Sequence, residues 1–81
     1  MNIYIGNLNY QVEEANVQQM LEDFGPVVSV KLILDRDTGR SRGFAFVEME
    51  NAEDANRAIK ELNGADYEGR ALVLREARPR D

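Results

Sequence analysis

Residues 42–49, with the sequence RGFAFVEM, place two phenylalanines between an arginine and a glutamate. In an extended strand successive side chains point to opposite faces, so Arg42, Phe44, Phe46 and Glu48 share one face. A face with a charge at each end cannot be sealed in a core without a desolvation cost, so we expect both rings to lie open. Exposed rings beside cations can stack on flat ligands, which makes this segment a candidate binding surface. The opposite orientation, with both rings in the core, is disfavoured by these charges.

Other kinds of chemistry find little support. The sequence has no cysteine and no histidine, which excludes disulfides, Cys-His and Ser-His-Asp nucleophiles, and the usual zinc ligand sets. Neighbouring carboxylates such as Glu13 and Glu14 point in different directions on a helix and do not form an acid–base pair. Residues 35–39, DRDTG, resemble the start of a calcium loop, but Gly39 stands at a ligand position and no glutamate follows at the required spacing. We therefore predict a protein that is not an enzyme and has no cofactor and no metal.

Four strands are expected to position these side chains. β-branched and aromatic runs predict strands at residues 2–6, 27–34, 42–49 and 71–76. A polar loop with a turn at residues 37–39 separates the second and third strands, and a brief extended piece is expected at Tyr67.

Two helices are expected between the strands. Apolar residues at helical spacing predict one helix at residues 13–24, stopped by Gly25-Pro26, with Glu13 as a poor N-cap. The second helix begins after Asn51, which we expect to form a capping box with Asp54, and Gly64 ends it.

The resulting order, β-α-β-β-α-β, predicts an α+β fold of the ferredoxin-like type. Right-handed crossovers place both helices on one face of a four-stranded antiparallel sheet and leave the other face uncovered. At 81 residues the chain is one domain, near the lower limit for a single hydrophobic core. The core is expected under the two helices, from Ile3, Ile5, Val30, Leu32, Ala45, Val47, Met49, Leu72 and Leu74 of the sheet and Val17, Leu21, Phe24, Ile59 and Leu62 of the helices.

The uncovered face is predicted to carry an aromatic surface. The first and third strands are central neighbours in this fold, so Tyr4 should lie beside Phe44 and Phe46. Three rings rimmed by cations would let nucleobases stack on them. The expected cations are Lys31, Arg42 and Arg75.

Two segments carry a family resemblance. IYIGNL, residues 3–8, and RGFAFVEM resemble the RNP2 and RNP1 motifs of the RNA recognition motif, and the likeness extends over essentially the whole sequence. It implies that Tyr4 and Phe44 stack on successive bases, that Phe46 packs against a sugar or between nucleotides, and that Arg42 pairs with phosphate. Met49 departs from the family, which usually has an aromatic residue there, but this position faces the core.

The resemblance also implies weaker assignments at the end of the chain. Asn2, Arg75 and residues 76–78, including Arg78, occupy positions where family members hydrogen-bond base edges. We expect a single RNA recognition motif domain at residues 1–77 and a short basic tail at 78–81. The chain looks like the small bacterial proteins of this family.

The net charge of −5 argues at first sight against a nucleic-acid ligand, because phosphate affinity usually needs a basic surface. The predicted sheet face, its loop and the tail hold seven basic against five acidic residues, a balance of plus two. The rest of the chain holds three basic against ten acidic residues, a balance of minus seven. The acidity therefore falls on the helical side, where it is expected to be a solvated surface.

These observations predict weak, micromolar binding of two to four nucleotides of single-stranded RNA, with modest sequence specificity, as in post-transcriptional regulation. Single-stranded DNA remains a possible ligand. The alternative is a protein-interaction module that uses the same aromatic face. No apolar run approaches the ~20 residues needed to cross a bilayer, so we expect no membrane partner. A monomer in the cytoplasm is the expected state.

Overall fold

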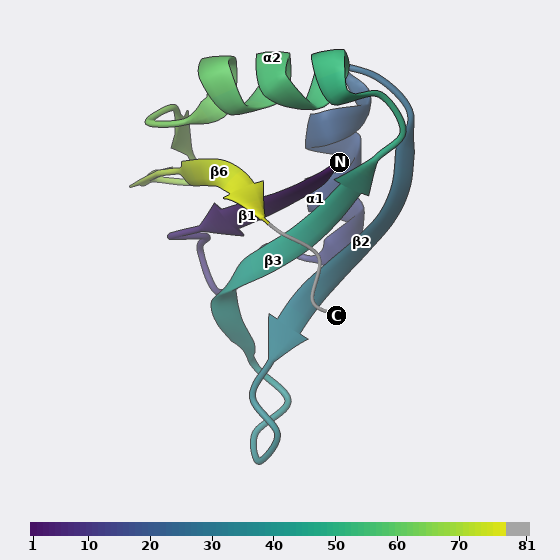
Figure 1. Ribbon diagram of the computed structural model, residues 1–81. Coiled ribbons are helices and arrows are strands. Elements are labelled where there is room, and N and C mark those ends of the chain that lie inside the picture. Colours follow the sequence, from purple (N-terminus) through teal and green to yellow (C-terminus); the bar gives the residue numbers. More distant parts are fainter. Residues whose placement is uncertain (78–81) are drawn as a thin grey trace.

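The computed structural model describes residues 1–77, so the predicted basic tail and Arg78 lie outside the described residues. The elements follow the expected order (Figure 1). They are β1 (Asn2–Gly6), α1 (Glu14–Glu22), β2 (Val27–Leu34), β3 (Ser41–Met49), α2 (Ala52–Leu62), β4 (Asp66–Tyr67), β5 (Arg70–Ala71) and β6 (Val73–Ala77).

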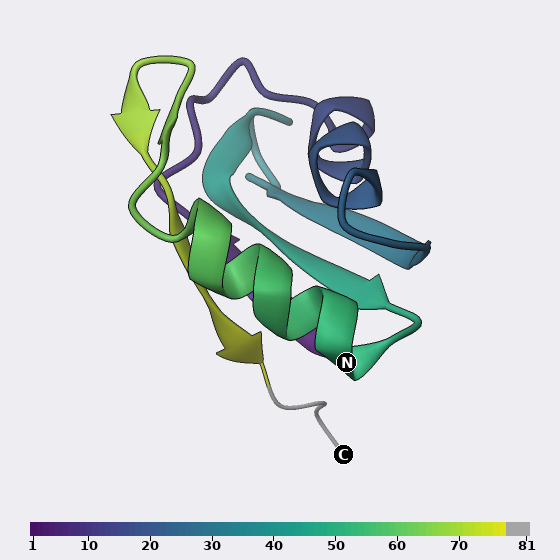
Figure 2. The same cartoon turned by 90° about the horizontal axis from the view of Figure 1, so that it is seen from above.

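The main sheet has the predicted topology. Its strands lie in the order β2-β3-β1-β6, and each neighbouring pair is antiparallel. Both helices contribute to the core under one face of this sheet. Among residues 1–77 no helix crosses the other face, which is turned toward the viewer in Figure 1. Figure 2, seen from above, shows how α1 and α2 lie beside the strands. The ferredoxin-like α+β fold is confirmed.

The core contains most of the residues that the sequence predicts. Two of the expected sheet residues, Val30 and Leu32, are only partly buried because they lie on the edge strand β2. Three expected residues of the helical side are also only partly buried: Phe24, Ile59 and Leu62. Leu8 and Val12, which precede α1, are buried although neither was expected. The full buried set is Ile3, Ile5, Leu8, Val12, Val17, Leu21, Ala45, Val47, Met49, Ala55, Ala58, Leu72 and Leu74.

The helix starts differ from expectation. At α1 the Glu13 backbone N–H donates to the Asn16 side chain at 2.9 Å, so this start is better capped than its sequence suggests. The predicted capping box at α2 is wrong, because the Asn51 side chain makes no capping bond to the helix. Its amide instead donates to the Asp54 carboxylate at 3.3 Å, and this carboxylate also lies 3.4 Å from Arg57. Asn51 and Asp54 thus bond to each other, and the Asn51 side chain does not bond to the N–H groups of the first turn of α2.

The last strand is divided rather than continuous. Leu72 turns inward, where its N–H donates to the Ala65 carbonyl at 2.9 Å and its carbonyl accepts from the Gly64 N–H at 2.7 Å. The chain before this point forms the β4–β5 hairpin, which confirms the extended piece at Tyr67. Only the part after Leu72, β6, pairs with β1 in the main sheet.

Both outer edges of the main sheet are partly closed by side chains. On β2, the Leu32 N–H donates to a carboxylate oxygen of Glu14 at 3.0 Å. On β6, the Leu74 N–H donates to the side-chain oxygen of Asn63 at 3.0 Å. Each edge therefore has an outward N–H group that is already satisfied.

Candidate nucleic-acid interface

Four residues form a continuous row across the uncovered face of the sheet. Phe46 of β3 lies opposite Lys31 of β2 and opposite Tyr4 of β1, and Tyr4 lies opposite Arg75 of β6. Directly opposed residues point to the same face. The strand neighbours of this row, such as Ala45 on β3, are buried under the helices. The predicted orientation of RGFAFVEM is therefore confirmed, and we call this set the stacking row.

Three rings lie together on this face, and we call Tyr4, Phe44 and Phe46 the aromatic platform. Their centroids are 5.8 to 6.2 Å apart. The rings of Tyr4 and Phe44 are inclined by 32°, and Phe46 meets the other two nearly edge-on. Such edge-to-face contacts between aromatic rings are favourable, so they help to hold the three rings in this arrangement. Phe46 is 40% exposed, whereas the other two are half-buried.

Arginines cover two of the rings. The guanidinium carbon of Arg75 lies 4.6 Å from the centroid of Tyr4, and that of Arg42 lies 6.0 Å from the centroid of Phe44. Both distances fall within the range of cation–π attraction. In the free protein Arg75 therefore occupies a face of the ring to which the family resemblance assigns a base. A base that stacks on Tyr4 must displace this guanidinium or insert beneath it.

The Tyr4 ring rests on Gly6, a role that the sequence analysis did not identify. A Cβ atom at Gly6 would lie 2.6 Å from the Tyr4 hydroxyl oxygen and 2.8 Å from its Cε1 atom. The two residues are separated by two positions on one face of β1, so the absence of a side chain at Gly6 lets the ring lie flat. A glycine two positions after an outward-facing tyrosine is the signal that could have revealed this contact.

A second row of side chains crosses the sheet next to the stacking row. Glu48 of β3 lies opposite Ser29 of β2 and opposite Asn2 of β1, and Asn2 lies opposite Ala77 of β6. We call Ser29, Glu48 and Asn2 the polar row. Glu76, by contrast, lies opposite the buried Ile3 and so points to the helical side. Glu76 is one of the five acidic residues that the sequence assigned to the sheet face, its loop and the tail. That assignment is wrong, so the binding face is less acidic than predicted.

The loop between β2 and β3 is held by one carboxylate. Asp35 accepts hydrogen bonds from the backbone N–H groups of Asp37 at 2.8 Å and Thr38 at 3.1 Å. These bonds favour the charged form and lower the pKa of Asp35, and Arg42 adds a smaller effect in the same direction. The carboxylate thus organises the turn. Within residues 1–77 no cluster of three carboxylates could hold a metal ion.

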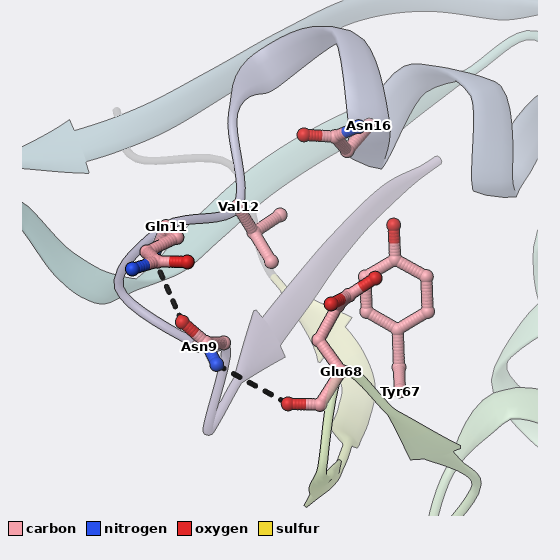
Figure 3. Close-up of a pocket in the computed structure, with 6 residues that line it drawn as sticks. All are labelled: Asn9, Gln11, Val12, Asn16, Tyr67 and Glu68. Carbon is pink, nitrogen blue, oxygen red and sulfur yellow. Dashed lines mark hydrogen bonds between the residues drawn. The ribbon is translucent and has the colours of Figure 1, made fainter.

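A small pocket lies apart from the aromatic platform, between the segment that precedes α1 and the β4–β5 hairpin (Figure 3). Asn9 braces it by donating to the Glu68 carbonyl at 3.2 Å and accepting from the Gln11 backbone N–H at 2.9 Å. Its volume is about 180 Å³, and none of the residues that line it is cationic. The bond from Asn9 to Glu68 thus links the segment before α1 to the β4–β5 hairpin.

Comparison with known proteins decides the family. The model of the RNA recognition motif matches residues 3–73. The chain belongs to the RNA recognition motif family. Tyr4, Phe44 and Phe46 of the aromatic platform lie within the two segments that resemble the RNP2 and RNP1 motifs, and both segments fall inside the matched range.

Several relatives share nearly the whole domain. The "Putative RNA-binding protein RbpD" of Nostoc sp. is 48% identical over 81 residues, which cover all of this chain and 86% of that protein. A crystal structure of RNA Binding Protein PG1 is 53% identical, has a TM-score of 0.96, and is matched over 100% of this chain and 98% of that one. The Rna15 RRM, solved with bound RNA (GU), is 31% identical with a TM-score of 0.88 over 99% of this chain and 85% of that one.

The structure brings together six of the eight predicted site residues. Tyr4, Phe44 and Phe46 form the platform, and three cations surround it: Lys31, Arg42 and Arg75. Asn2 lies in the adjacent polar row, and Arg78 is outside the described residues. No helix among residues 1–77 is long and apolar enough to cross a bilayer.

Proposed function

We propose that this protein binds single-stranded RNA by stacking bases on the aromatic platform, while the surrounding cations contact phosphates. The observation that carries the proposal is the stacking row, which joins two aromatic rings and two cations in register on the face that no helix covers. Membership of the RNA recognition motif family and the relative solved with bound RNA support it. The alternative of a protein-docking surface has no comparable support.

The exposure of the rings suggests a revised division of roles. Phe46 is the most exposed ring of the platform and lies between Tyr4 and Lys31, so we assign one base to Phe46 and a neighbouring base to Tyr4. Phe44 is half-buried beneath Arg42, a position better suited to contact with the sugars between the two bases. This assignment exchanges the roles that the family resemblance implied for the two phenylalanines.

The cations are assigned by position. Lys31, opposite Phe46, and Arg42, over Phe44, are both exposed and are proposed to contact phosphates. Arg75 leaves the Tyr4 ring when a base arrives, and it then joins Asn2 in contacts to base edges. With roughly 1 to 3 kcal/mol per stacked base and a few phosphate contacts, the affinity should be weak, in the micromolar range.

The test is fluorescence anisotropy with a labelled pool of random RNA octamers. Replacing both Phe44 and Phe46 by alanine should raise the dissociation constant at least about fivefold, because loss of the base stacked on Phe46 alone costs about 1 kcal/mol or more and the contact of Phe44 with the sugars is lost as well. Phe24→Leu is the matched control, since Phe24 packs against the core on the helical side under Arg57. Thermal unfolding should show that all proteins are folded. Equal binding by the double variant and the wild type would contradict the proposal.

The wider role follows from the same site. We propose a binding protein without catalytic activity, acting in the cytoplasm on RNA in post-transcriptional regulation. The absence of cysteine suits a reducing compartment, and the cyanobacterial relative supports a small RNA-binding protein of this type. The same oligonucleotides made as DNA would measure how strongly the interface prefers RNA.

A further inference from the structure

We infer that Glu48 makes this interface prefer guanine over the other bases at the position next to Phe46. The inference rests on the proposed function, because it concerns a base that is already stacked on the platform. It goes further by identifying the base and the group that selects it.

Glu48 is placed where the edge of a stacked base would reach it. It follows Phe46 by two residues on the same face of β3, about 7 Å along the strand. A purine stacked on the ring extends several ångströms beyond it, so its hydrogen-bonding edge can meet the carboxylate. Glu48 is exposed within the described residues 1–77, so a ligand can contact its side chain.

The neighbours of Glu48 do not neutralise it. Within residues 1–77 the single ion pair joins Asp54 to Arg57 on the helical side. Across the strands, Glu48 faces the hydroxyl of Ser29 and the amide of Asn2, groups that can donate or accept hydrogen bonds. The polar row therefore presents an acceptor-only carboxylate between two groups that can donate.

Guanine matches this pattern better than any other base. Its Watson–Crick edge has two adjacent donors, N1–H and the N2 amino group, followed by the O6 acceptor. A carboxylate can accept hydrogen bonds from both of these donors in a bidentate, charge-assisted pair, while Asn2 or Ser29 donates a hydrogen bond to O6. Uracil has one donor between two carbonyls, and the amino groups of adenine and cytosine lie next to a ring nitrogen that accepts. Each of these bases would direct an acceptor at the carboxylate and lose binding energy.

The experiment compares four labelled RNA heptamers, UUUNUUU, in which N is G, A, C or U. The wild type should bind the G heptamer about tenfold more tightly than the U heptamer, the discrimination expected from one bidentate contact. Glu48→Gln should reduce this ratio to about twofold or less, because the amide replaces one acceptor by a donor.

Glu76→Gln is the matched control. It makes the same chemical change and removes the same charge, but its side chain lies on the helical side. Glu76→Gln should keep the wild-type ratio of the G and U affinities. The loss of one negative charge can change all four affinities, but it should change them by the same factor.

The outcomes separate this inference from the proposed function. Equal binding of the four heptamers, preference for cytosine, or a guanine preference that survives Glu48→Gln would overturn the inference and leave RNA binding intact. Failure to bind any heptamer would overturn the proposed function and the inference with it.

Discussion

The substitution Gly6→Ala tests whether RNA binding depends on the Tyr4 ring lying flat on the sheet. The new Cβ atom would meet the far end of that ring at 2.6 to 2.9 Å. Favourable carbon contacts lie near 3.5 Å or beyond, so the ring must move outward by about 1 Å. Because the ring is the end of a rotatable side chain and Gly6 has no positive φ, the backbone should accept alanine at little cost.

The expected loss is a part of one stacking contact. Stacking is worth roughly 1 to 3 kcal/mol per base, so a displaced ring should cost about 1 kcal/mol, a roughly fivefold rise in the dissociation constant. The thermal unfolding midpoint should change little, since glycine in a strand has an entropic cost that alanine avoids. Anisotropy with the random octamer pool measures the first quantity, and circular dichroism the second.

A double-mutant cycle makes this prediction specific. If Gly6→Ala acts only through the ring, it should have almost no effect on RNA binding in a Tyr4→Ala background, and the coupling energy should be about 1 kcal/mol. The reasoning is refuted if Gly6→Ala binds RNA as tightly as the wild type, or if it causes the same loss whether or not the tyrosine is present.

Two further predictions concern charge. If Lys31 and Arg42 each contact one phosphate, the logarithmic salt slope should be about 1.4, which weakens binding roughly sevenfold between 50 and 200 mM salt. Lys31→Ala should lower the slope by about 0.7, and a slope near zero in the wild type would count against phosphate contacts. The lowered pKa of Asp35 means that its carboxylate stabilises the β2–β3 turn above the ordinary value of 3.8, and that this contribution is lost as the pH falls through the lowered folded value. The protection factors of the turn amides, obtained by NMR from exchange rates compared with the intrinsic rates at each pH, should therefore fall at acidic pH in the wild type, whereas Asp35→Asn should show no such step.

The orientation of the binding face could be predicted because the information is local. A strand has a period of two, and the charges of Arg42 and Glu48 at its ends decide which set of side chains faces solvent. The β-α-β-β-α-β order then fixes the neighbours of β3 and brings Tyr4 to the same surface. Neither step requires knowledge of distant contacts, and both agree with the structure.

Features that depend on competition between side chains could not be predicted in this way. Asn51 is a residue type that often caps helices, but its side-chain amide donates a hydrogen bond to the nearby Asp54. Its side chain therefore makes no capping bond to the helix. Leu8 is buried in a loop that has no periodic pattern to reveal it. The position of Arg75 over Tyr4 depends on the register between two strands that are distant in the sequence. Each of these outcomes is decided by tertiary geometry.

The side chains of Glu14 and Asn63 that close the two sheet margins have a consequence for crowded conditions. An edge strand with unpaired N–H and C=O groups would allow the sheet of one copy to pair with that of the next, which can begin a fibre. With one N–H group on each margin already satisfied, a strand of a second copy would find fewer free partners there. Glu14 and Asn63 thus make pairing between copies through their sheet margins less favourable.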